Sequence, residues 1–546
     1  MVESRAPASP RLWLWLAGYF LILLIPTGLL PLMESTEGRY GEIAWEMVAS
    51  GNYLEPFFNG IKHFHKPPLT YWAIAAGYKL FGINDFGARF FGVVAACLAV
   101  AYLYRVALVL LDDYRQARDA ALIFATSLLF LGVARIVATD IYLTCFTVMA
   151  QYYLFRRIAG PARRSDAPLY GLALGLGFLA KGPLIFLFTL LPFLLAKFFD
   201  AGHRRLFSWR ETALAVATFA LVALPWYVAV MIENPGLLYY FLKVQTVDRV
   251  ASNRFRRYEP PWYFFYVFAG TFLPYIFFFL KGAVRLRKFD RSRQVLFLYV
   301  LVPFLIFTLA QSKQPTYILP FYGMAAILAA GALARLAMPR LRLLAVLVLL
   351  VAAIAPAVAG FVYPPARPLR SVLLLATIPA LWLWWQALRD HRGELLIPRC
   401  AALLLLVTTV AYGVAAVAAP QMRGYEQMAQ ALNRLDPGRK LDVLVYRGFL
   451  PSLSLYRRHL TASAYGMERE VQFQENQDYR NWYLPTAADL QRYLGDRKEL
   501  FVVMNAEAKP SFETESGYRC APVYEQRKHN AYRCRVAADA ANPGQE

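Results

Sequence analysis

The chain has 546 residues, of which 58% are hydrophobic and only 17% are charged, whereas soluble domains carry roughly 25% charged residues. This composition excludes one large soluble core and is typical of a polytopic membrane protein. The net charge of +22 fits basic cytoplasmic loops, because the chain carries no nucleic-acid-binding motif. We therefore expect membrane lipids as partners and no nucleic acid.

Apolar runs recur along the chain from the N-terminus to residue 419. The first run, 12–33, has no small-residue cleavage site and predicts a retained helix. About thirteen runs approach the roughly 20 residues that a membrane span needs. They are 12–33, 87–111, 119–136, 139–156, 168–181, 183–199, 211–232, 262–281, 294–311, 315–336, 342–363, 369–388 and 398–419. The predicted fold class is a polytopic α-helical membrane protein, in which the short pair 168–181 and 183–199 can be divided differently.

Basic residues concentrate in alternate loops between these runs, for example RRIAGPARRSD, KGAVRLRKFDRSR and RDHRGELLIPR. Lys and Arg are retained on the cytoplasmic side of a membrane, so this bias predicts a cytoplasmic N-terminus. An odd number of spans then places residues 420–546 on the outer side.

Residues 420–546 differ in character from the membrane domain, which we assign to 1–419. The runs 442–446 (DVLVY) and 499–504 (ELFVVM) predict strands, and AADLQRYLGDR between them predicts a helix. The segment therefore predicts a small α/β domain. Cys520 and Cys534 are its only cysteines, and they either form a disulfide in an oxidising compartment or stay as two thiols.

The first outer loop, 34–84, is too long for a simple turn and contains two amphipathic stretches. In EGRYGEIAWEMVASG the apolar residues follow the spacing of a helix face, with Thr36 as the predicted N-cap and Gly51 within the predicted stop. A second helix, LTYWAIAAGYKLFG, follows Pro67 and Pro68. Both stretches suit helices that lie in the membrane interface.

Ionisable residues gather at the outer ends of the predicted spans, where charge is costly and usually functional. Together with the first loop they offer acids, cations and aromatic rings to one outward-facing site. The candidates are Glu34, Glu37, Arg39, Tyr40, Lys66, Tyr71, Asp140, Lys181, Arg249, Lys313 and Tyr317. Cations beside interfacial helices suit an anionic lipid-linked phosphate. The alternative for any one lysine or tyrosine is a plain interfacial anchor.

The segment TEGRYGEIAWEMVASGNYLEPFFNGIKHFHKPPLTYW resembles the first periplasmic loop of the lipid A aminoarabinose transferases. These bacterial enzymes have the GT-C fold and are related to protein O-mannosyltransferases. Further motifs follow in the family's order: a TD pair that opens a span, AKGPL, an Arg-rich loop before PPWYFF, and SKQPTYILP. The resemblance covers about residues 12–330, and thirteen spans with a periplasmic domain fit the family plan.

The resemblance implies an inner-membrane glycosyltransferase that uses a sugar on a polyprenyl phosphate, usually undecaprenyl phosphate, and often lipid A as acceptor. It implies donor-phosphate binding by Lys66 and Lys181. It also implies that Arg39, Tyr40, Arg249 and Tyr317 line the site. Lys313 and Tyr71 are further substrate-binding candidates because of their predicted place on the same outer side. The general base would be Glu37, Glu34 or Asp140, although a phosphate acceptor is already anionic and needs little help from a base. We expect a monomer.

Two departures from the family pattern affect the chemistry. Thr36 stands where the family has an aspartate, and His65 stands where it has an acid before Lys66. No cofactor is certain from the sequence, although His65 and Asp140 could hold a divalent metal. We expect His63 and His65 to face opposite sides of an extended loop, which argues against both of them binding one ion unless the backbone bends.

Two other functions compete with a lipid A glycosyltransferase. One keeps the donor but transfers to a protein or a polysaccharide. The other is a flippase for a lipid-linked sugar, which predicts ionisable residues near the middle of spans. Because the ionisable residues here lie at the outer ends of spans, the sequence favours the enzyme.

Overall fold

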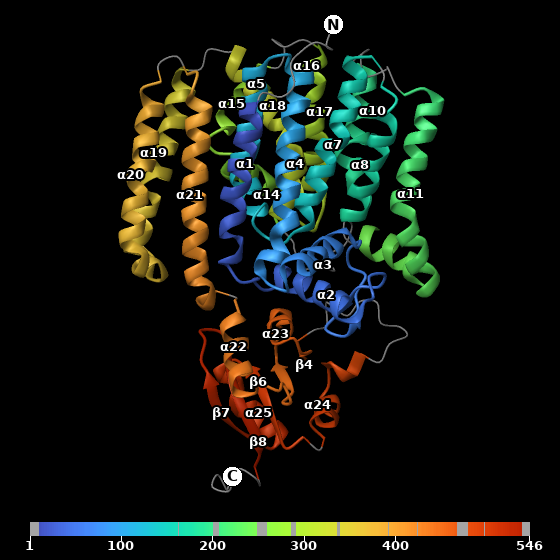
Figure 1. The fold of residues 1–546 in the computed structure, drawn as a ribbon, viewed down its shortest axis with the longest axis vertical. Helices are drawn as coiled ribbons and strands as arrows, with labels where there is room; N and C mark the ends of the chain where they lie inside the picture. The colour runs from blue at the N-terminus through green and yellow to red at the C-terminus, as the bar shows by residue number, and fades with distance from the viewer. Residues whose placement is uncertain are drawn as a thin grey trace. The chain divides into compact units, whose positions relative to one another are not determined.

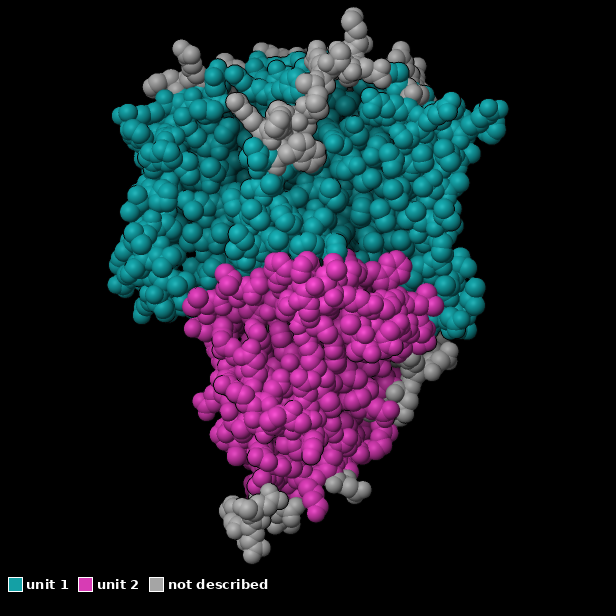
Figure 2. Space-filling view, viewed as in Figure 1, with its two compact units in different colours: residues 1–27, 66–70, 89–414 teal, residues 28–65, 71–88, 415–546 magenta. Residues whose placement is uncertain are grey.

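The computed structural model describes residues 10–161, 163–199, 207–247, 259–285, 291–335, 339–390, 393–422, 424–466, 479–495 and 497–537. The chain forms two compact units, which Figure 2 colours separately. Unit 1 comprises 1–27, 66–70 and 89–414, and unit 2 comprises 28–65, 71–88 and 415–546. Most of the first outer loop therefore belongs to the same unit as the C-terminal α/β segment.

Unit 1 is built from helices, drawn in Figure 1 from blue through green and yellow to orange. The helices up to the middle of the chain are α1 (Pro10–Leu24), α4 (Asp85–Leu111), α5 (Tyr114–Thr126), α6 (Leu128–Val133), α7 (Thr139–Ala159), α8 (Asp166–Lys181), α9 (Leu184–Phe188), α10 (Leu190–Phe199), α11 (Trp209–Glu233) and α12 (Leu237–Tyr239). After them come the π-helix η3 (Tyr240–Val247), α14 (Tyr263–Thr271), α15 (Ile276–Val284), α16 (Arg291–Leu296), α17 (Leu298–Leu309), α18 (Tyr322–Arg335), α19 (Pro339–Val362), α20 (Arg370–Leu388) and α21 (Leu396–Ala418). The 3-10 helices are η1 (Ile25–Gly28), η5 (Pro315–Phe321) and η6 (Pro364–Leu369). The first residues of α4 and the last of α21 lie in unit 2.

Six helices of the described residues are long and apolar enough to cross a membrane, or up to seven if the bent pair α14 and α15 is one span. The count of about thirteen is therefore not reached by this criterion, because several predicted runs are divided into shorter helices. The run 12–33 forms the consecutive helices α1 and η1, which end at Gly28, and 262–281 is bent by 120° between α14 and α15. The protein is nevertheless a polytopic helical membrane protein.

Burial separates a central helix from peripheral ones. The span Pro315–Arg335, which joins η5 to α18, is 89% buried in its most apolar window, whereas α11 and the spans of α20 and α21 are only 22% buried. Large apolar side chains such as Leu221 and Val351 are exposed on the peripheral helices. In a membrane these surfaces face lipid, since helices satisfy their backbone hydrogen bonds internally.

In unit 2 the first outer loop contains α2 (Thr36–Ser50), α3 (Leu69–Phe81), and the short strands β1 (Phe57–Phe58) and β2 (Ile61–Lys62). Both predicted amphipathic helices are therefore present. The N-cap of α2 is Ser35, one residue before the predicted Thr36, and Gly51 ends the helix at φ 75° as predicted. A positive φ is the usual reason for glycine at this position.

The C-terminal segment forms the predicted α/β domain. Its helices are α22 (Glu426–Leu435), α23 (Pro451–Arg457), α24 (Ala487–Leu494) and α25 (Lys509–Ser516), and its 3-10 helices are η7 (Ala419–Gln421), η8 (Tyr479–Asn481) and η9 (Ala506–Ala508). Its strands are β3 (Val443–Tyr446), β4 (Ala462–Ala464), β5 (Tyr483–Leu484), β6 (Glu499–Met504), β7 (Tyr518–Tyr524) and β8 (Asn530–Val536). They form one sheet in the order β5-β4-β3-β6-β8-β7, parallel from β5 to β6 and antiparallel at β8 and β7.

Helices cover both faces of this sheet, because successive strand residues point to opposite sides. Leu444 and Tyr446 pack with α24 and α25, whereas Val443 and Val445 pack with α22 and α23. A strand buried on both faces must be apolar throughout, and this explains why VLVY and LFVVM carry no alternating polar residues.

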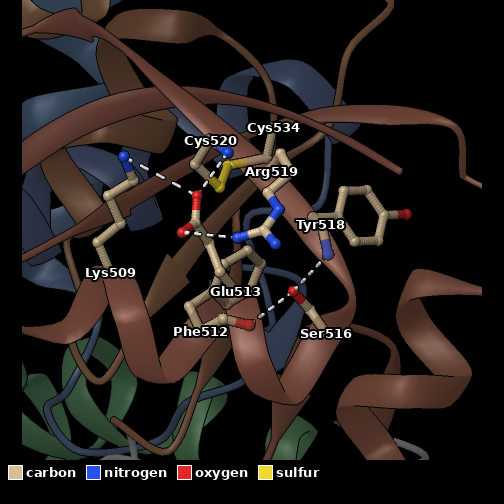
Figure 3. The surroundings of a disulfide bond; sticks show 8 residues. All are labelled: Lys509, Phe512, Glu513, Ser516, Tyr518, Arg519, Cys520 and Cys534. Atoms are coloured by element: carbon tan, nitrogen blue, oxygen red, sulfur yellow. Dashed lines mark hydrogen bonds and ion pairs between the residues drawn. A yellow bond between two sulfur atoms is a disulfide. The ribbon is translucent and has the colours of Figure 1, made fainter. Parts of the chain in front are cut away.

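A disulfide joins Cys520 of β7 to Cys534 of β8, so the first of the two alternatives for these cysteines is the one observed (Figure 3). The two residues are directly paired in the antiparallel ladder. Glu513 of α25 supports the bridge, because its Oε1 accepts the Cys520 N–H at 2.8 Å. The hairpin at the sheet edge is thus tied both to itself and to a helix.

Candidate functional site

Asp140 and Lys181 form a buried ion pair in unit 1. Lys181 Nζ lies 2.5 Å from Asp140 Oδ1, and the two side chains are only 5% and 8% exposed. Asp140 lies in the first turn of α7 and Lys181 is the last residue of α8, and the two helices pack against each other. A carboxylate at a helix N-terminus and an ammonium at a C-terminus both complement the helix dipole. The packing thus joins two charges that are 41 residues apart in sequence.

The AKGPL motif explains why α8 ends at this lysine. Gly182 has φ 69° and ψ −149°, a region that is essentially restricted to glycine. Pro183 follows, and a proline disfavours helical conformation in the residue before it. The helix therefore stops directly after Lys181 and leaves its side chain at the helix end.

Tyr317 completes this cluster. Lys181 Nζ lies 4.8 Å from the centroid of the Tyr317 ring, within the range of a cation–π contact. Tyr317 belongs to η5, which packs against α7. Lys313, just before η5, is buried and donates a hydrogen bond of 3.0 Å to the Glu259 carbonyl oxygen. Three of the predicted residues thus meet at one point, and Lys313 ties the adjoining segment to the chain before PPWYFF.

Lys66 and Arg249 are two further predicted cations. Lys66 belongs to unit 1, follows β2 and precedes α3 in the chain, and is half-buried. Arg249 lies outside the described residues, so its predicted role stays a prediction.

The predicted first-loop residues gather around α2 in unit 2. Glu37, Arg39 and Tyr40 are all buried on this helix. The Tyr40 ring lies 5.4 Å from the ring of Tyr71 on α3, and the Arg39 guanidinium lies 5.9 Å from the ring of Phe58. The helices α2 and α3 thus carry one acid, one cation and two tyrosines.

Both candidate acids of this segment accept main-chain hydrogen bonds. Glu34 Oε1 accepts the N–H of Ser452 at 2.6 Å, and Glu37 Oε2 accepts the N–H of Met33 at 3.3 Å. Gly38 permits the first contact, because a Cβ at that position would lie 3.0 Å from both carboxylate oxygens of Glu34. The C-terminal domain therefore contributes directly to the position of Glu34.

The two histidines lie on the same side of the loop. The ring centroids of His63 and His65 are 5.5 Å apart, so the expectation that an extended loop would separate them is wrong, because residues i and i+2 of an extended segment lie on the same face. The His63 N–H continues the antiparallel pairing of β1 and β2 by donating to the Pro56 carbonyl oxygen at 2.8 Å, so the chain is still extended at His63. Across the residues that the structure describes, no group of three or more His, Cys, Asp or Glu side chains could hold a metal ion. His65 and Asp140 belong to different units.

Sequence reasoning missed a pair of acids on α2. Glu42 is fully buried and Glu46 partly buried, and the two residues lie one turn apart on α2. Burial and the charge of the neighbouring acid hold the pKa of Glu42 well above its usual range, and burial raises the pKa of Glu46. The i, i+4 spacing of the two acids on one predicted helix was the available signal.

The chain is similar in sequence to known proteins. Residues 65–258 match the model of the family described as dolichyl-phosphate-mannose-protein mannosyltransferase. The chain is 35% identical over 324 residues to an undecaprenyl phosphate-alpha-4-amino-4-deoxy-L-arabinose arabinosyl transferase of Aeromonas salmonicida, a match that covers 58% of each chain. It is 34% identical over 336 residues to the Edwardsiella ictaluri protein of the same name, covering 59% of this chain and 60% of that one. The match thus spans less than two thirds of these curated relatives.

Two solved structures share the fold over nearly the whole chain. The crystal structure of ArnT from Cupriavidus metallidurans bound to undecaprenyl phosphate has a TM-score of 0.82 at 21% identity, and the similarity covers 98% of this chain and 100% of that one. The apo structure of the same protein has a TM-score of 0.80 at 20% identity and covers 99% and 100% of the two chains. These comparisons confirm the resemblance to the aminoarabinose transferases and show an ArnT-like fold.

Proposed function

We propose that the protein is an integral-membrane glycosyltransferase that transfers 4-amino-4-deoxy-L-arabinose from undecaprenyl phosphate to lipid A or a related envelope glycolipid. The names of the curated relatives and the ArnT-like fold support this donor. The observation that carries the proposal is the buried cluster of Lys181, Asp140 and Tyr317, which holds a cation ready for an anionic lipid phosphate.

The chemistry follows from the leaving group. Transfer breaks the bond between the sugar and the donor phosphate, so negative charge develops on the departing undecaprenyl phosphate. A positioned ammonium stabilises that charge in a site from which water is largely excluded. Lys181 meets this need if the phosphate replaces Asp140 as its partner, and Lys66 and Arg249 are the further candidate cations.

The general base depends on the acceptor. A phosphate oxygen of lipid A is already anionic and attacks the sugar without losing a proton, whereas a hydroxyl acceptor needs a base. Glu37, Glu34 and Asp140 are the candidates for that base. Glutamine and asparagine variants of the three distinguish the cases: wild-type transfer rates in all three would exclude a base among them, and one inactive variant would identify it.

Lipid A mass spectrometry tests the function directly. Lipid A from cells that express the wild-type chain should gain the mass of one or two aminoarabinose groups, and cells with Lys181→Met should not. Lys197→Met is a matched control, because Lys197 Nζ also lies 5.8 Å from an aromatic ring, that of Phe193, but outside the proposed site. Unmodified lipid A from an active, well-expressed protein would instead favour a protein or polysaccharide acceptor, which the mannosyltransferase family match also supports.

The membrane arrangement remains part of this proposal. We infer about thirteen spans of GT-C type, a cytoplasmic N-terminus and a periplasmic C-terminal domain in the bacterial inner membrane. The basic loops support this orientation, and the Cys520–Cys534 disulfide suits an oxidising compartment. Alkaline phosphatase fused after residue 537 should be active, and a fusion after residue 161 should not. The reverse pattern would overturn the orientation.

A divalent metal and a monomeric state are separate parts of the proposal. Metal analysis of purified, active protein tests the first, since turnover without bound metal would exclude a catalytic metal at His65 and Asp140. Light scattering in detergent tests the second, and a mass of two chains would refute the monomer.

A further inference from the structure

Asn59 lies at the tip of the hairpin between β1 and β2, in the first outer loop. Its φ is 51° and that of Gly60 is 77°, so both central residues of the turn are left-handed, as a two-residue hairpin turn of type I′ requires. Asparagine tolerates this conformation better than other side chains. Unlike most turn residues, however, Asn59 is completely buried.

The Asn59 side chain is buried because it bonds to a segment about 400 residues away, in the C-terminal domain. Its Nδ2 donates to the Thr461 carbonyl at 2.5 Å, and its Oδ1 accepts from Ser454 Oγ at 2.7 Å and from the Thr461 N–H at 3.3 Å. The hydroxyls of Ser454 and Thr461 lie 2.8 Å apart. Because Ser454 donates its single proton to Asn59, Thr461 must donate to Ser454. Each polar atom of the amide group is thus bonded to the C-terminal domain.

The backbone of the same turn is held from the other side by α2. Glu42 Oε1 accepts the Asn59 N–H at 3.0 Å, and Glu46 Oε1 accepts the Gly60 N–H at 2.9 Å. Burial and the neighbouring carboxyl group of Glu46 raise the pKa of Glu42. The turn is therefore clamped between the helix that carries Glu37, Arg39 and Tyr40 and the C-terminal domain.

The packing of α2 shows that this clamp belongs to a continuous contact. A Cβ on Gly41 would lie 3.0 Å from Leu455 Cδ2, so α2 and α23 approach at a glycine. Near the end of α23, the Tyr456 hydroxyl donates to Asp85 Oδ1 at 2.5 Å. Residues 450–461 thus contact the first loop, and Asn59 bonds to them from the β1–β2 turn as Glu34 does from the start of the loop.

We propose that Asn59 is a positioning residue, through which the C-terminal domain holds α2 and the histidine segment in the shape that transfer requires. This proposal rests on the proposed function for its effect on transfer. Asn59 acts on the reaction through α2 and through His63, whose N–H continues the hairpin pairing. The C-terminal domain then contributes to catalysis by positioning these segments.

Asn59→Gly is the sharpest variant, because glycine keeps the left-handed backbone and removes only the three side-chain hydrogen bonds. Asn52→Ala is the matched control: Asn52 lies in the same loop, and its Oδ1 accepts the N–H groups of Leu54 and Glu55 at 3.1 Å but bonds to nothing in the C-terminal domain in the described contacts. The double variant Cys520→Ala, Cys534→Ala is a second control, since it loosens the C-terminal domain away from the clamp.

Two measurements are made on each full-length protein in detergent. Hydrogen exchange of residues 57–65 should accelerate about tenfold to a hundredfold in Asn59→Gly, because each net hydrogen bond contributes a factor of about five. The turnover number kcat should fall about tenfold, with KM for the donor unchanged within about twofold, because the cations proposed for the donor phosphate lie in unit 1. Both controls should keep kcat within about twofold of wild type.

The outcomes separate the two proposals. Unchanged exchange in Asn59→Gly would overturn the clamp, and faster exchange with wild-type kcat would overturn the positioning role. An equal loss of kcat in the disulfide variant would also overturn it, because general loosening would then explain the effect. If the wild-type protein transfers nothing, the proposed function fails, and the exchange measurement alone decides whether Asn59 holds the loop.

Discussion

Replacing Asp140 by asparagine tests whether the buried Lys181 pair is held for a phosphate. At the observed 2.5 Å the attraction between the two charges is roughly 7 kcal/mol at an effective dielectric constant of 20, before desolvation. Asparagine keeps the shape of the side chain but leaves a buried ammonium without its counter-charge. Breaking one partner of a buried pair costs about 3–5 kcal/mol, and Lys181→Met should cost a similar amount by leaving the carboxylate.

The double variant Asp140→Asn, Lys181→Met should be more stable than either single variant suggests. It contains no uncompensated charge, so we expect a cost below about 2 kcal/mol and a coupling energy above about 2 kcal/mol. Apparent Tm values in detergent, measured by size exclusion after heating, give the comparison. Additive losses in the double variant would refute the pairing.

Added undecaprenyl phosphate extends the same test to function. A lipid phosphate that binds Lys181 supplies the charge that Asp140→Asn lacks, so it should raise the apparent Tm of that variant more than that of wild type. It should raise the Tm of Lys181→Met least. Equal shifts in all three proteins would show that Lys181 does not contact the phosphate.

Three further predictions concern single features of the structure. Glu42→Gln should stabilise the protein at neutral pH, because the raised pKa of Glu42 means that the folded state retains a proton which the unfolded chain releases above pH ~4.3. The stability of the wild-type protein therefore falls as the pH rises toward the folded-state pKa of Glu42. Thermal melts from pH 4 to 8 should show a flatter stability profile for the glutamine variant. A steeper profile would contradict the raised pKa of Glu42. Reducing the disulfide, or replacing Cys520 and Cys534 by alanine, should cost about 3 kcal/mol for a loop of about 15 residues, measured by urea unfolding of the full chain, and an unchanged midpoint would refute a stabilising bridge. Tyr317→Leu should weaken undecaprenyl phosphate binding up to tenfold while Tyr317→Phe keeps it, because the ring rather than the hydroxyl contacts the ammonium; equal affinities in a lipid-binding titration would exclude the ring contact.

Local sequence patterns determined most of the secondary structure. The run 499–504 forms β6 with the predicted bounds, and EGRYGEIAWEMVASG forms α2, which ends at Gly51. These elements depend on side-chain period and on residues that start or stop a helix, and both are properties of a few neighbouring residues. The turn at Asn59-Gly60 was predictable for the same reason, since this dipeptide is a strong hairpin signal.

The number of spans was harder to predict than the apolar runs themselves. Hydropathy registers composition over about 20 residues and does not detect where a run bends or divides. The run 262–281 illustrates this, because it is apolar throughout but forms two helices that meet at 120°. Pro274 lies at this break, where a proline removes a backbone donor.

The residues of the candidate site could be predicted from the sequence, but their contact partners could be found only from the tertiary structure. The sequence by itself determined that Asp140, Lys181 and Tyr317 lie at the ends of apolar segments, because charge and polar rings are costly inside a membrane. Only helix packing decided that Lys181 pairs with Asp140 and lies over Tyr317. The Asn59 clamp is the extreme case: its bonds join segments about 400 residues apart, and no local preference encodes such a contact, because it exists only once both segments have folded.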